Sequence, residues 1–138
     1  MSDNKKTELQ LIPKSETYIQ YMIDVIFKLP RTEKFSMGTE YKTSMYKMLE
    51  SIMLLSKVSD EQKLNLINHI DAQLNTQRIL LRIMYKNRWI DDKKFKVASD
   101  LIYEEAKRYY EEILGLKRNL ISLIREWLLI ILEMKNLQ

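Results

Sequence analysis

The chain of 138 residues has no cysteine, only two glycines, two prolines and a single histidine. The absence of cysteine excludes disulfides, thiolate metal sites and thiol nucleophiles. Sheets, hairpins and long loops use glycine and proline far more often than this, so we expect an all-α fold. The length suits one domain with one hydrophobic core.

Long apolar runs and targeting signals are also missing. The first ten residues, MSDNKKTELQ, are polar and charged, unlike a secretory signal peptide. The longest apolar run, from Trp127 to Leu132, has six residues, whereas a helix that spans a bilayer needs about 20. We therefore expect a cytoplasmic protein with no membrane association.

Four stretches of the sequence carry the apolar spacing of amphipathic helices. We predict helices over Pro13–Leu29, Ser36–Lys57 and Asp60–Arg88, and a fourth that begins at Asp91 or Asp92. Short connections make consecutive helices antiparallel, which predicts an up-down-up-down antiparallel four-helix bundle with an extended C-terminal helix.

The first connection contains three residues with expected structural roles. Pro30 should end the first helix, because its ring clashes with a preceding helical turn. Gly38 should allow a close backbone approach near the start of the second helix, and Phe35 should close the end of the core. Residues 1–11 are expected to form a flexible tail, and residues 12–138 to form the single domain.

The last helical pattern continues to the end of the chain. Gly115 lies within it and leaves three outcomes open, a bend, a break or a continuous helix. Beyond it, residues 116–138 form an extension whose apolar cluster surrounds the helix. One bundle buries only one face, so we expect the extension to contact another subunit. The alternative is that it wraps onto its own bundle.

Candidate catalytic and metal-binding residues are scarce. His69 is the only histidine, has no obvious nucleophile beside it and is expected at the surface. A di-iron site needs Glu-x-x-His pairs on two helices, whereas Leu66 stands three residues before His69. There is no glycine-rich phosphate-binding motif. We predict no catalytic residue, no metal, no cofactor and no enzyme activity.

Positive charge is concentrated in one part of the chain. The net charge is +4, and residues 76–96 alone hold seven basic and two acidic residues. The bundle topology brings the first and third connections to one end, and a basic surface there would attract polyanions. The alternative is a solvated face that binds nothing. The candidate binding residues are Arg31, Lys34, Arg78, Arg82, Lys86, Arg88, Lys93, Lys94 and Lys96.

Two segments resemble a family of small bacterial four-helix-bundle proteins. This family includes the accessory variability protein (Avd) of diversity-generating retroelements and proteins encoded within intervening sequences of ribosomal RNA genes. The first segment, LPRTEKFSMG, matches the family through Leu29, Pro30, Arg31, Lys34, Phe35, Met37 and Gly38. The second, LNTQRILLRIMYKNRWID, matches through Arg78, Leu80, Leu81 and Arg82.

The resemblance, over about residues 12–115, implies a non-enzymatic accessory protein. It implies a homo-oligomer, a pentamer for Avd-like members, that binds RNA or DNA through a basic surface. In retroelements it implies a reverse transcriptase as partner. The long apolar segment at the end departs from the family pattern. The alternative function is a protein-interaction module whose basic face meets an acidic partner protein.

Overall fold

The computed structural model describes the backbone of residues 2–136 and the side chains of residues 11–108. Farther along, the described side chains are those at 111, 114–116, 118, 121, 122, 124–126, 128–133 and 136.

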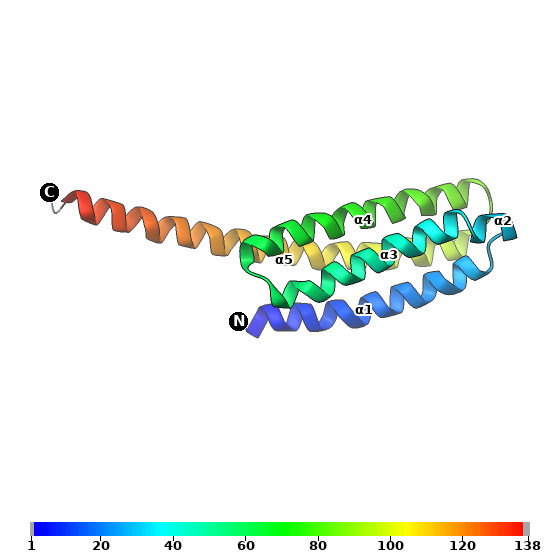
Figure 1. Ribbon diagram of the computed structural model, residues 1–138, viewed down its shortest axis with the longest axis horizontal. Coiled ribbons are helices and arrows are strands. Elements are labelled where there is room, and N and C mark those ends of the chain that lie inside the picture. The colour runs from blue at the N-terminus through cyan, green and yellow to red at the C-terminus, as the bar shows by residue number, and fades with distance from the viewer. Residues whose placement is uncertain (1, 137–138) are drawn as a thin grey trace.

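The described chain is helical from end to end. Its elements are α1 (Ser2–Phe27), α2 (Arg31–Lys34), α3 (Met37–Leu54), the 3₁₀ turn η1 (Leu55–Lys57), α4 (Asp60–Lys86) and α5 (Asp92–Asn136). The four long helices alternate in direction, and α1 packs against both α3 and α5 to close the bundle (Figure 1). The predicted up-down-up-down four-helix bundle is confirmed.

The first helix is longer than predicted and includes most of residues 1–11, which were expected to form a flexible tail. Helix α1 begins at Ser2 and runs through Pro13. Proline inside a helix removes one hydrogen bond and disfavours the helix without forbidding it. Leu11 is 3% exposed and belongs to the core. Its burial therefore stabilises the helical turn that precedes the proline.

The connection between α1 and α3 is a tight turn that contains α2. Gly38 is buried, and a Cβ atom there would lie 2.8 Å from Cγ2 of Ile26, so the predicted close approach is confirmed. The prediction for Phe35 is wrong, because its side chain is 76% exposed. Leu29 and Ile90, 3% and 4% exposed, belong to the core at this end of the bundle.

Helix α5 continues without interruption through Gly115 for 45 residues. A Cβ atom at Gly115 would have no neighbour within 4 Å, so nothing there requires glycine or bends the helix. Leu116 is 2% exposed and is the last buried residue among the described side chains. Beyond it the helix projects away from the bundle, on the side where α1 begins (Figure 1).

A hydrogen-bonded network lies inside the core and joins three helices. The Tyr18 hydroxyl of α1 donates to Oε1 of Gln77 on α4 at 2.7 Å and shares a hydrogen bond with the Tyr41 hydroxyl of α3. Nε2 of Gln77 donates to Oγ of Ser44 at 3.1 Å, and that hydroxyl donates to Oε1 of Gln73 at 2.8 Å.

The three central members of this network have no contact with solvent. Tyr18, Tyr41 and Gln77 are each 0% exposed, and burial raises the pKa of the Tyr41 hydroxyl above its ordinary value. A buried polar group that loses its partner costs about 1–3 kcal/mol. The network therefore favours the one packing of α1, α3 and α4 in which every buried polar group has its hydrogen-bond partner.

We expect Tyr18→Phe to destabilise the bundle by about 1–3 kcal/mol. The substitution removes one hydroxyl, which leaves the Tyr41 hydroxyl and the Gln77 carbonyl without their common partner. Urea denaturation measures the loss. Tyr46→Phe is the matched control, because Tyr46 is 46% exposed and surface changes usually alter stability by less than about 0.5 kcal/mol. Equal stabilities for the two variants would contradict this role of the network.

Candidate nucleic-acid interface

The nine predicted basic residues lie on α2, on the C-terminal part of α4 and on the first turns of α5. Figure 1 shows that the α1–α3 connection and the α4–α5 connection occupy the same end of the bundle. We call these nine residues the basic end. Its members are Arg31 and Lys34 on α2, Arg78, Arg82 and Lys86 on α4, Arg88 in the connection, and Lys93, Lys94 and Lys96 on α5.

Most of these charges have no acidic partner in the part of the chain whose side chains are described. Among the described side chains, Arg88 alone of the nine has a carboxylate within ion-pair distance, with its Nη1 atom 3.9 Å from Oδ1 of Asp92. Arg78 makes one long contact, 3.5 Å from Nη1 to Oδ1 of Asn75, which is uncharged. Six of the nine side chains are exposed, and the other three are half-buried. The basic end therefore carries positive charge that is free to attract an anion.

The acidic residues at this end serve the fold. Asp91 caps α5, as predicted for Asp91 or Asp92, by accepting the backbone N–H of Lys94 at 2.8 Å. Asp92 accepts the hydroxyl hydrogen bond of Tyr85 at 2.5 Å, and this bond is the main reason that the pKa of Tyr85 is raised. Glu33 accepts a hydrogen bond from the Ser36 hydroxyl at 3.1 Å. These carboxylates are already engaged in local contacts.

Helix α4 ends at Lys86, two residues before the predicted end, in a turn that places Arg88 in an unusual conformation. The N–H of Arg88 donates to the Tyr85 carbonyl and that of Trp89 to the Met84 carbonyl, both at 3.0 Å. This is a Schellman ending, in which glycine normally takes the left-handed position. Arg88 takes it here with φ of 62°.

The left-handed backbone conformation of Arg88 costs conformational free energy. For residues other than glycine this conformation costs about 1–2 kcal/mol. The side chain contacts the Tyr85 ring, 5.5 Å from the guanidinium carbon to the ring centroid, and forms the long ion pair with Asp92. Strain kept at a charged surface residue is a reason to suspect a function for its side chain.

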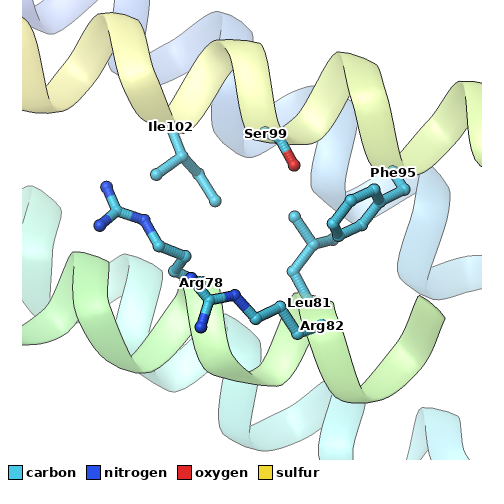
Figure 2. A pocket seen from close by; sticks show the side chains of 6 residues that line it. All are labelled: Arg78, Leu81, Arg82, Phe95, Ser99 and Ile102. Atoms are coloured by element: carbon cyan, nitrogen blue, oxygen red, sulfur yellow. The ribbon is translucent and has the colours of Figure 1, made fainter. Parts of the chain in front are cut away.

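A pocket of about 220 Å³ opens between α4 and α5 beside this end. Arg78 and Arg82 project from α4 along its rim, and the Ser99 hydroxyl points from α5 into the space between the helices (Figure 2). Leu81, Ile102 and Phe95 supply an apolar lining, and the Phe95 ring stacks on Tyr85 with centroids 4.3 Å apart. Two guanidinium groups and a hydroxyl around an apolar floor suit a phosphate group beside a planar ring.

Two exposed aromatic rings belong to the same end and were missed as contact residues by the sequence analysis. Phe27 and Phe35 are 72% and 76% exposed, and Nζ of Lys34 lies 4.3 Å from the centroid of the Phe27 ring. The sequence did carry a signal, because both rings lie next to lysine around a proline turn. Exposed rings among cations are able to stack on unpaired bases.

The predicted position of the single histidine and the search for a metal site can be compared with the described residues. His69 is exposed on α4, as expected. Among the described residues, no three His, Asp or Glu side chains are placed so that they could hold a metal ion. A search of the same residues also finds no helix long and apolar enough to cross a membrane.

Comparison with known proteins supports the resemblance seen in the sequence. The family described as bAvd-like matches residues 6–108, about three quarters of the chain. The chain belongs to the bAvd-like family. No curated protein matches it. The matched residues contain α2, α3, α4 and the first part of α5, so the whole basic end of this bAvd-like protein lies within the family region, and the projecting part of α5 lies beyond it.

We expect Arg88→Gly to be more stable than Arg88→Ala by about 1 kcal/mol. Both variants remove the same side-chain contacts, but only glycine adopts the left-handed conformation without steric cost. Thermal or urea denaturation of the two variants measures the difference. An alanine variant as stable as the glycine variant would mean that the turn carries no strain.

Proposed function

We propose that this protein is a non-enzymatic accessory protein that binds nucleic acid, RNA or DNA, through the basic end. The observation that carries the proposal is the shortage of acidic partners there. Of the nine cations, only Arg88 lies within ion-pair distance of a described carboxylate. A surface with this many free cations gains affinity for polyanions by releasing the counterions that surround phosphates.

The shape of the basic end favours a nucleic-acid strand over a small anion. Its cations extend along α4 from Arg78 to Lys86, a rise of about 12 Å at 1.5 Å per residue, and continue onto α5 through Lys96. A single phosphate would meet only a few of them. A strand presents a phosphate at each nucleotide, and its bases could use the exposed rings of Phe27 and Phe35.

Membership in the bAvd-like family supports the rest of the proposal. The family points to an accessory protein of retroelements, and we infer a reverse transcriptase as its protein partner. We also infer a homo-oligomer, because several copies of one basic end bind a strand more tightly than a single copy. Affinity without base-specific contacts would suit a protein that holds the template or product while another protein performs the chemistry.

Reversal of three charges on α4 tests the proposal. We expect Arg78→Glu, Arg82→Glu and Lys86→Glu together to lower the affinity for single-stranded RNA and for duplex DNA at low salt by at least about tenfold, because three phosphate contacts become repulsive. Fluorescence anisotropy with labelled oligonucleotides of mixed sequence measures the affinity, and circular dichroism verifies that the variant is helical.

The matched control carries the same change in charge away from the basic end. Lys47→Glu, Lys57→Glu and Lys107→Glu alter three exposed lysines on α3, η1 and the middle of α5. If affinity depends only on net charge, the control variant will lose as much affinity for nucleic acid as the α4 variant. That result would mean that the basic end is not the binding surface. Unchanged affinity in a folded α4 variant would contradict the proposal directly.

A further inference from the structure

We propose that residues 117–136, which we call the α5 extension, pack in parallel with the same segment of other copies of this chain to form a closed ring of helices. The proposal specifies the surface for the oligomeric part of the proposed function. It does not depend on nucleic-acid binding, and the two are tested by separate measurements.

The α5 extension exposes an unusual amount of apolar surface. It projects from the bundle (Figure 1), and no other described element lies beside it. Patches of this kind on soluble proteins mark interaction sites, and an isolated helix of about 20 residues is only marginally stable in water. Its side chains that are 52% to 59% exposed are Ile121, Ile124, Leu128, Leu129, Ile130 and Leu132.

The apolar residues of the α5 extension form two adjacent lines along the helix. The first line holds Ile121, Ile124, Leu128 and Ile131, which are three, four and three residues apart. The second holds Ile130 among the described side chains, and sequence spacing alone adds to it Leu120, Leu123, Trp127 and Met134. Spacing of three and four is the pattern with which helices pack side by side in coiled coils.

Two such lines determine how many neighbours each helix needs. A dimer covers one line and leaves the other in water. In a ring each helix lies between two neighbours, one on each line, so both are buried. Cyclic symmetry then makes all the helices parallel. Since the α5 extension leaves the bundle opposite the basic end (Figure 1), a parallel ring directs every basic end the same way.

The second line continues the face that α5 already buries in its own bundle. Ile102 and Leu116 are 1% and 2% exposed, and Ile130 follows Leu116 by the same two heptads that separate Leu116 from Ile102. A helix from another copy therefore meets an apolar surface that runs without interruption out of the bundle. The opposite face carries Ser122, Glu126 and Asn136, all exposed.

The size of the surface also favours more than one neighbour. Twenty helical residues extend about 30 Å with a diameter of about 10 Å, so half of the cylinder is about 500 Å². Two helices that pair along one line only would each bury about half of that area, or about 500 Å² in total, which is below the size of a specific complex. In a ring, each helix has a second neighbour and buries both lines, so the total buried area is large enough for a stable complex.

The test uses the full chain and substitutions at side chains that are already exposed. We expect the double variant Ile124→Glu, Leu128→Glu to lose the oligomeric mass of the wild-type protein, because two carboxylates would be buried at each helix contact. Light scattering after size-exclusion chromatography measures the mass at micromolar concentration. Circular dichroism verifies the bundle, which does not bury either side chain.

The matched control is Ser122→Glu, Leu129→Glu, which adds the same charge on the opposite face, where Leu129 is 55% exposed. We expect this control to keep the wild-type mass. A monomeric wild-type protein, or an unchanged mass in the Ile124/Leu128 variant, would overturn the proposal, as would equal dissociation of both variants. Binding of a monomeric wild-type protein to anionic lipid vesicles would identify a membrane surface as the occupant instead.

Anisotropy titrations of the same variants with RNA separate this proposal from the proposed function. A variant that loses its oligomeric mass but still binds RNA, more weakly, supports the ring and leaves the basic end as the binding surface. A wild-type oligomer of the predicted kind that binds no RNA would leave the ring intact and contradict nucleic-acid binding.

Discussion

The buried hydrogen bonds around Tyr18 are the constraint on which the rest of this structure depends. Apolar side chains alone would let four amphipathic helices slide or rotate with little loss of buried area. Tyr18, Tyr41 and Gln77 admit one relative position of α1, α3 and α4, because any other leaves a fully buried polar group unsatisfied. Once α1 is fixed, its connection to α3 and therefore Arg31 and Lys34 are fixed beside the end of α4.

The sequence predicted the bundle because the fold rests on simple periodic information. Apolar residues such as Met22, Met45, Ile70 and Leu81 recur at helical spacing, and each is fully or almost fully buried. The short connections then allow little besides antiparallel neighbours. The network was not predictable in the same way, because Tyr18 and Tyr41 occupy positions in the apolar pattern and Gln77 resembles a surface residue until its partners are known.

The errors in the prediction share one cause. Local sequence does not reveal which side chains occupy the core at a given place in the bundle. Phe35 was expected in the core because it is large and apolar, but Leu29 and Ile90 are the residues buried at that end. The start of α1 was placed too late because Pro13 is a strong local signal, whereas the burial of Leu11 is a tertiary effect. For the interface, charge and topology were sufficient to bring the nine cations to one end. Coordinates were needed to show that, among the described side chains, only Arg88 of the nine has a carboxylate within ion-pair distance, and that its backbone is strained.

The two ends of the molecule have different chemistry. One end combines free cations with exposed aromatic rings, and the other continues into an apolar helix beyond the region shared with the bAvd-like family. The bundle between them has a rigid buried network and separates the two surfaces. This arrangement suits an accessory protein that gathers several copies at one end and presents their charges to a strand at the other.

The most direct test of electrostatic nucleic-acid binding is the salt dependence of the wild-type affinity for single-stranded RNA. Each phosphate contact contributes about −0.7 to the slope of log affinity against log salt concentration. If four or more cations of the basic end contact phosphates, the slope should be about −3 or steeper. A slope near zero, or no measurable binding at low salt, would contradict the account and favour an acidic protein partner or none.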